Sequence, residues 1–97
     1  MSEAGFVAVL VIDLHFPESG SLKSKRKELS SIKAQLHGRL GVAVSETDHH
    51  DLWQRAEVTV CVVSTDRAHA ERVLREADRM VAAAPGARVV DQATSFV

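Results

Sequence analysis

The sequence predicts an α+β domain of the ferredoxin-like class, in which a four-stranded antiparallel sheet carries two helices on one face. Three observations predict it: two long apolar runs of strand-like composition, two segments with apolar residues at helical spacing, and the order β-α-β-β-α-β along the chain. In this topology the first and third strands occupy the centre of the sheet, and these are the two most apolar runs here. We expect residues 1–97 to form a single domain of this type.

The first strand is expected over residues 6–15, because both of its faces are largely apolar. A helix should begin near Ser21, a good N-cap residue, and end at Gly41, a residue type that favours a helix C-terminus. Its inward stripe at helical spacing consists of Leu22, Leu29, Ile32, Leu36 and Leu40.

Residues 42–47 and 53–64 are expected to form a hairpin around the polar loop 48–51. The second helix should follow the N-cap candidates in segment 64–66, and Pro85-Gly86 should end it. Its inward stripe consists of Ala70, Val73, Leu74, Ala77, Met80 and Val81. Residues 88–97 have mixed polarity, which suits an edge strand.

Composition limits the function. The net charge is −1, so any affinity for nucleic acid must come from a local patch. The single cysteine, Cys61, lies in an apolar run, which indicates a buried, inert thiol in a reducing, cytoplasmic compartment. The early apolar run at residues 4–12 is too short for a membrane span, so no membrane partner is expected.

The topology brings two distant polar segments to one end of the sheet. The first strand leads to this end, the first helix starts there, and the hairpin loop lies there too. We therefore expect a polar cluster of His15, Asp48, His49, Asp51 and Trp53 beside the start of the first helix.

The first helix opens with four cations, Lys23, Lys25, Arg26 and Lys27, although cations in a first turn oppose the helix dipole. One interpretation is an anion or nucleic-acid site made by these side chains with Ser21 and Arg55. The other, which carries slightly more weight, is a solvated helix face neutralised by Glu18, Asp48 and Asp51.

Other chemistry is disfavoured. The loop 48–51 contains metal-ligand residue types, but adjacent residues on a tight turn rarely all face one ion, so no metal and no cofactor are expected. His49 and Asp51 lack an obvious nucleophile, so no catalytic residue is assigned. Trp53 could stack on a base, but packing of its ring on a helix end is the favoured interpretation. The central strands do not offer the base-stacking aromatics of RNA-recognition domains.

The sheet face opposite the helices should be apolar. Val7, Val9 and Val11 alternate with the core residues of the first strand, and Val63 or its neighbours should join them. Such a patch is large for a monomer, so we expect a homodimer through the open sheet face.

Several segments resemble one family. "LHFPESGSLKSKR", "SETDHHDLWQRA" and "VVSTDRAHAERVL" are similar to the YlxP-like family of small bacterial proteins of unknown function, over about residues 9–90. His50 stands where glutamine is usual in that family. The resemblance implies a ferredoxin-like fold, a cytoplasmic bacterial protein, and genes adjacent to those for translation initiation and small-subunit maturation factors, which is an association without a mechanism.

The sequence leaves three functional hypotheses. The first is a non-enzymatic accessory factor in translation or ribosome maturation that contacts RNA phosphate. The second is a sensor or enzyme for a small phosphate-containing ligand that uses the same end of the molecule. The third is a structural dimer that docks another protein.

Overall fold

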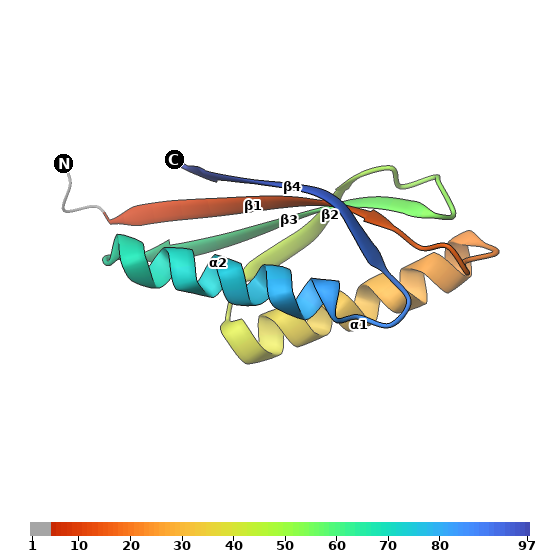
Figure 1. Ribbon diagram of the computed structural model, residues 1–97, viewed down its shortest axis with the longest axis horizontal. Coiled ribbons are helices and arrows are strands. Elements are labelled where there is room, and N and C mark those ends of the chain that lie inside the picture. The colour runs from red at the N-terminus through yellow and green to blue at the C-terminus, as the bar shows by residue number, and fades with distance from the viewer. Residues whose placement is uncertain (1–4) are drawn as a thin grey trace.

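The computed structural model describes residues 5–97, so the first four residues of the expected domain lie outside the described part. The elements are β1 (Phe6–His15), α1 (Leu22–Leu40), β2 (Ala43–Asp48), β3 (Arg55–Ser64), α2 (Arg67–Ala82) and β4 (Arg88–Phe96). The strands form one antiparallel sheet in the order β2-β3-β1-β4, and both helices lie against the same face (Figure 1). The predicted ferredoxin-like fold is confirmed.

The two central strands are in register along their whole length, from Phe6 opposite Ser64 to His15 opposite Arg55. Alternate residues of β1 and β3 point toward the helices and are buried there, which is the period of two that a pleated strand imposes. The helices close this face with stripes at helical spacing. The largest buried apolar side chains are Leu10, Ile12, Leu14, Phe16, Leu29, Leu36, Val42, Val58, Val60 and Val81.

Side-chain and backbone caps fix the helix ends near the predicted positions. The hydroxyl of Ser21 accepts from the Ser24 amide (3.0 Å), and the carboxylate of Asp66 accepts from the Ala68 amide (3.0 Å). Gly41 ends α1 in the left-handed region (φ 66°), where a side chain would be strained.

The bounds of two strands differ from the sequence expectation. Strand β2 runs from Ala43 to Asp48, one residue later than expected at each end. Strand β3 begins at Arg55 rather than Trp53, and the side chain of Gln54 donates to the loop that follows β1. Helix α2 ends at Ala82, ahead of Pro85-Gly86, as the helix-disfavouring effect of proline on the preceding residue leads one to expect.

The open sheet face carries the valines expected there. Val7, Val9 and Val11 alternate with the buried residues of β1, and Val7 lies opposite Val63. Cys61 lies opposite Val9 on this same face and is only partly buried, so the expectation of a fully buried thiol is wrong. The error arises because residues 58–63 form an almost continuous apolar run, whereas the helices cover only one face of β3. No helix within residues 5–97 combines the length and apolar character that crossing a membrane requires.

Candidate functional site

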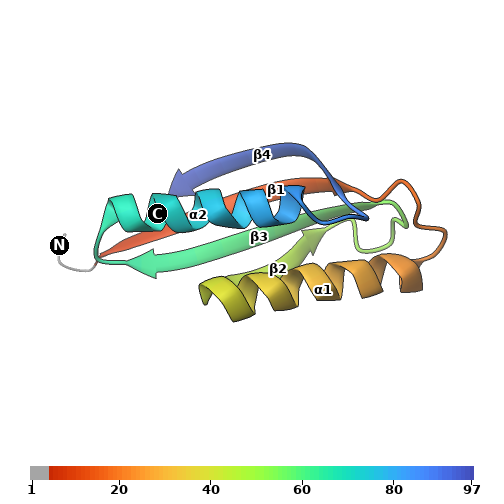
Figure 2. The ribbon, with the colours of Figure 1, turned by 60° about the horizontal axis from the view of Figure 1, so that its bottom comes forward.

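Three segments that are distant in sequence meet at one end of the molecule (Figure 2). They are the loop after β1, the first turns of α1, and the β2–β3 hairpin loop; we call this end, made by residues 16–27 and 48–54, the loop pole. The side-chain amide of Gln54 donates to the carbonyl oxygens of Pro17 (3.2 Å) and Ser19 (3.1 Å), which joins the hairpin loop to the loop after β1. The basic helix start and the histidine-containing hairpin therefore share one end, as the topology requires.

Lys25 holds the loop pole together from inside. Its side chain is fully buried, and its ammonium group donates to the Glu46 carboxylate (3.0 Å) and to the carbonyl oxygens of His49 (2.8 Å) and Arg55 (3.0 Å). A buried cation is tolerated only when it is paired and hydrogen-bonded, and Lys25 meets both conditions. The sequence placed Lys25 among the cations that could contact an external anion, whereas its ammonium group is taken up by protein oxygens.

The hairpin turn depends on this ammonium group. His49 has a left-handed backbone (φ 64°), which is uncommon for a residue other than glycine. Its carbonyl oxygen accepts from Lys25 and from the Leu52 amide (3.1 Å), and its amide donates to the Asp48 carboxylate (2.7 Å). These contacts offset the strain and hold one loop conformation.

Ser21 is occupied by capping. Its hydroxyl accepts from the Ser24 amide, and its carbonyl oxygen accepts from the hydroxyl of Ser19 (3.0 Å). The Ser21 side chain therefore fixes the entry of the chain into α1.

The remaining three cations of the helix start face solvent. Lys23, Arg26 and Lys27 are exposed, and their spacing places them on one side of α1. The first turn of α1 contains no acidic residue. Within residues 5–97, none of the three cations forms an ion pair, so Glu18, Asp48 and Asp51 do not neutralise them through direct contact.

An exposed aromatic side chain lies at the same pole. Trp53 is 56% exposed and its neighbour Leu52 is 47% exposed. More than half of the Trp53 surface is therefore open to solvent, and the favoured interpretation, that one side of its ring packs on a helix end, stays a prediction. The chain turns through a short loop between His49 and Arg55, and this loop projects beyond the sheet.

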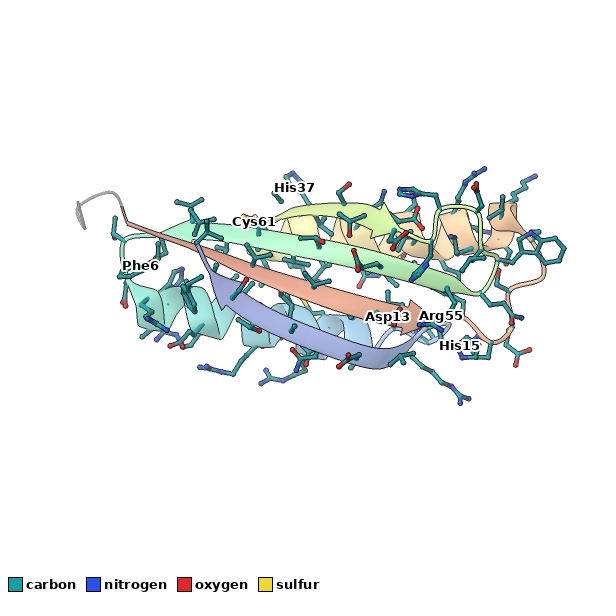
Figure 3. All side chains as sticks on the ribbon, turned by 90° about the horizontal axis from the view of Figure 1, so that it is seen from above. Phe6, Asp13, His15, His37, Arg55 and Cys61 are labelled. Atoms are coloured by element: carbon teal, nitrogen blue, oxygen red, sulfur yellow. The ribbon has the colours of Figure 1, made fainter. Side chains whose placement is uncertain are left out.

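Arg55 is separated from the helix cations. Its guanidinium group pairs with Asp13 on the open sheet face (2.5 Å), at the end where His15 also lies (Figure 3). Both side chains of the pair are partly exposed. Arg55 thus contributes its carbonyl oxygen to the interior of the loop pole and its charge to a different surface.

The histidines in and near the loop pole contact different partners. His49 lies 4.0 Å from Asp48, the ring of His50 contacts the carbonyl oxygen of Glu46 (3.1 Å), and His15 is on the open sheet face. Within residues 5–97, no three histidine, cysteine or acidic side chains are grouped as metal ligands would be. The arrangement offers charge and an exposed ring, rather than a set of convergent reactive groups.

Sequence reasoning missed the internal role of Lys25 and its acceptor Glu46. A signal was present, because Lys25, Leu29, Ile32 and Leu36 are spaced at intervals of four, three and four residues and form one stripe. A lysine within such a stripe points inward, and its ammonium group must then find acceptors. No comparable signal identified Gln54, since its partners are main-chain oxygens of a loop.

Fold and loop pole together define a small ferredoxin-like protein with a cationic end that carries an exposed tryptophan. The chain belongs to the family described as "Protein of unknown function (DUF503)", whose model matches residues 7–94. No curated protein matches the chain.

Proposed function

We propose that this protein is a non-enzymatic RNA-binding accessory factor, and that the loop pole is its RNA contact. The observation that carries the proposal is the combination of three exposed cations on one side of α1, unpaired among residues 5–97, with an exposed tryptophan at the same pole. Lysine and arginine bind phosphate without regard to sequence, and an aromatic ring offers a stacking surface to an unpaired base. This combination suits single-stranded RNA, whose bases are free to stack.

The buried ammonium group of Lys25 supports the proposal, because it makes the pole rigid. Lys25 joins α1 to the hairpin that carries Trp53, so the cations and the ring keep a fixed relation. A site that is already ordered loses less entropy when it binds.

Within RNA, we propose the ribosome or its maturing small subunit as the partner. The support is the resemblance of the chain to the YlxP-like family, whose genes are associated with translation initiation and small-subunit maturation factors. A bacterial, cytoplasmic protein is part of this proposal.

The test uses Trp53 as its own reporter, since it is the only tryptophan of the chain. Titration with a mixed-sequence single-stranded RNA should change the intrinsic fluorescence. The double variant K23E/R26E should bind more weakly, and the slope of log K against log salt should fall by roughly 1.4, because two cations no longer bind phosphate. The matched control is R72E/R75E, which reverses two exposed arginines of α2 and should leave binding unchanged.

Two outcomes would count against RNA. Fluorescence that responds to inorganic phosphate or a nucleotide, but not to RNA, would favour the small-ligand alternative. A groove of about 610 Å³ runs beside the cations and is lined by Ser24 and Lys27, but also by Glu18 and Glu28, whose charges oppose an anion. Equal loss of binding in both double variants would indicate a general effect of charge, without a site at the pole.

The third hypothesis concerns assembly. We propose that the protein acts as a homodimer through its open sheet face, and the alternative function is that of a purely structural dimer that docks another protein through either end. The support is the row of partly exposed valines opposite the helices.

A further inference from the structure

A groove of about 260 Å³ runs between α2 and the edge strand β4, and the residues that line it lie outside the loop pole. Helix α2 packs mainly on the central strands β1 and β3, so the helix side of β4 is only partly covered (Figure 2). Drug-sized ligands occupy pockets of roughly 300–1,000 Å³. The groove therefore suits a smaller molecule.

The side-chain pattern of β4 changes where the groove lies. The register places Val89, Gln92, Thr94 and Phe96 on the helix side of the strand, since each lies opposite a buried residue of β1. Val89 and Phe96, nearer the two ends of the strand, pack against the core. Gln92 and Thr94, in the middle, line the groove. Packing alone would favour apolar residues at these two positions, so their hydrogen-bonding groups point to a role in binding.

Helix α2 presents two opposite charges to the same groove. Arg75 and Asp78 both line it and are three residues apart, so their Cβ atoms lie about 5–6 Å from each other on the helix surface. Within residues 5–97, neither side chain forms an ion pair, whereas Glu76 and Arg79, at the same spacing on α2, pair with each other. The charges of Arg75 and Asp78 are therefore available to a ligand.

The carboxylate of Asp78 is poorly solvated. Its Oδ1 atom is buried and, among residues 5–97, has no hydrogen-bond partner. The negative charge must then be stabilised through the rest of the carboxylate, which lines the groove. Glu71 is the other acid of the lining, and its carboxylate lies 4.0 Å from the guanidinium group of Arg67. Asp78 is therefore the acid that has more to gain from a donor in the groove.

From these groups we infer that the groove binds a free α-amino acid with an apolar side chain. The ammonium group of the ligand donates to Asp78, and its carboxylate accepts from Arg75. An α-amino acid carries both charges on one carbon atom, which matches two opposite charges that are neighbours on one helix face. Gln92 and Thr94 supply hydrogen bonds from the other wall of the groove. This site is separate from the RNA contact proposed above.

The floor of the groove selects the side chain of the ligand. Leu10 of β1 and Leu74 of α2 line the groove and are almost fully buried. An aliphatic side chain placed against them leaves water, whereas a polar one would lose its hydration without a partner. A nucleotide is disfavoured, because the described lining offers its phosphates one cation, Arg75, beside two carboxylates.

The experiment uses L-leucine as the probe and follows binding by amide NMR of the full chain. Titration should shift the signals of residues 74–78 and 92–94 selectively. Leucinamide lacks the carboxylate and N-acetylleucine lacks the ammonium group, so each should bind about tenfold more weakly or worse, because a charge-assisted contact is lost. Glycine, which lacks the apolar side chain, should also bind more weakly than leucine.

Charge-removing variants locate the site. D78N and R75Q each remove one of the two charges but keep a polar side chain, and each should raise the Kd for leucine by about tenfold or more. The matched controls E76Q and R79Q remove the same two charges from the ion pair elsewhere on α2, and should change the Kd by no more than about twofold. Dispersed amide spectra would show that each variant is folded.

Four results would overturn the inference. The first is the absence of a selective shift at the solubility limit of leucine. Leucinamide or N-acetylleucine that binds as tightly as leucine would show that a single charge is recognised, as at a peptide terminus. Unchanged binding in D78N and R75Q would place leucine on a different surface. Equal weakening in all four variants would indicate a general effect of charge on α2.

Discussion

The ammonium nitrogen of Lys25 lies 2.8 Å from the main-chain carbonyl oxygen of His49, a residue 24 positions later in the chain. The same nitrogen contacts the carboxylate of Glu46 and the carbonyl oxygen of Arg55, at the two sides of the hairpin loop. One side chain of α1 therefore fixes both the turn and its distance from the helix. The geometry of the exposed cations and Trp53 depends on this buried contact.

Replacing Lys25 with methionine should destabilise the protein strongly. The variant leaves the Glu46 carboxylate, which is 13% exposed, without its cation, and it leaves the main-chain oxygens of the hairpin without a donor. Breaking a buried ion pair by removing one partner costs about 3–5 kcal/mol. Urea unfolding followed by circular dichroism should show this loss as a lower midpoint with an unchanged slope.

Two further variants test the cause. K23M removes an exposed cation two residues away and should change the free energy of unfolding by no more than about 0.5 kcal/mol. K25M/E46L removes both charges of the buried pair and should recover part of the loss. A cost below about 1 kcal/mol for K25M would contradict the role given to this side chain.

Two glycines near the end of α1 should respond in opposite directions to alanine. Gly38 lies within the helix, and a Cβ there would meet nothing within 4 Å. G38A should therefore stabilise the protein by about 0.5–1 kcal/mol, since alanine loses less backbone entropy in a helix. Gly41 has equally open surroundings but a φ of 66°, so G41A should cost about 1–2 kcal/mol through backbone strain alone.

Differential scanning calorimetry of these two variants provides the check. Since neither Cβ meets a neighbour, packing cannot explain a difference in sign between them. If both variants were stabilised, the left-handed C-cap at Gly41 would be wrong.

The capping carboxylate of Asp66 should contribute more to the free energy of unfolding than the side chains beside it do. It accepts from the Ala68 amide, and the Asp66 amide donates to the Ser64 hydroxyl (3.0 Å). D66A should cost about 1 kcal/mol, whereas D66N, which keeps an acceptor oxygen, should cost less. T65A alters the exposed residue between the two partners and serves as the control in thermal unfolding. Equal effects of D66A and T65A would argue against the cap.

Patterns that repeat along the chain made the fold predictable. The valines of β1 alternate with core residues, so the sequence assigned Val7, Val9 and Val11 to the open face, and the helical stripes assigned the side of each helix that is buried. The loop pole was less predictable, because its order comes from single contacts. Trp53 is 56% exposed in a loop that the Gln54 side chain joins to the loop after β1, and no repeating pattern in the sequence indicates either feature. The charge of Lys25 favoured a surface position, whereas its helical spacing from Leu29, Ile32 and Leu36 indicated the buried position that it occupies.

Truncation of Trp53 should separate binding from stability. The ring is 56% exposed and lies outside the core, so W53A should change the free energy of unfolding by no more than about 0.5 kcal/mol, measured by circular dichroism because the variant lacks tryptophan. If the ring stacks on an RNA base, W53A should weaken RNA binding by about 1–3 kcal/mol, and W53F should recover part of the affinity because it retains an aromatic face. Fluorescence anisotropy with a labelled single-stranded RNA provides the measurement.

L52A is the control, since it removes apolar area from the same loop without removing a ring. Equal losses in W53A and L52A would indicate general apolar contact and would exclude stacking as the role of Trp53.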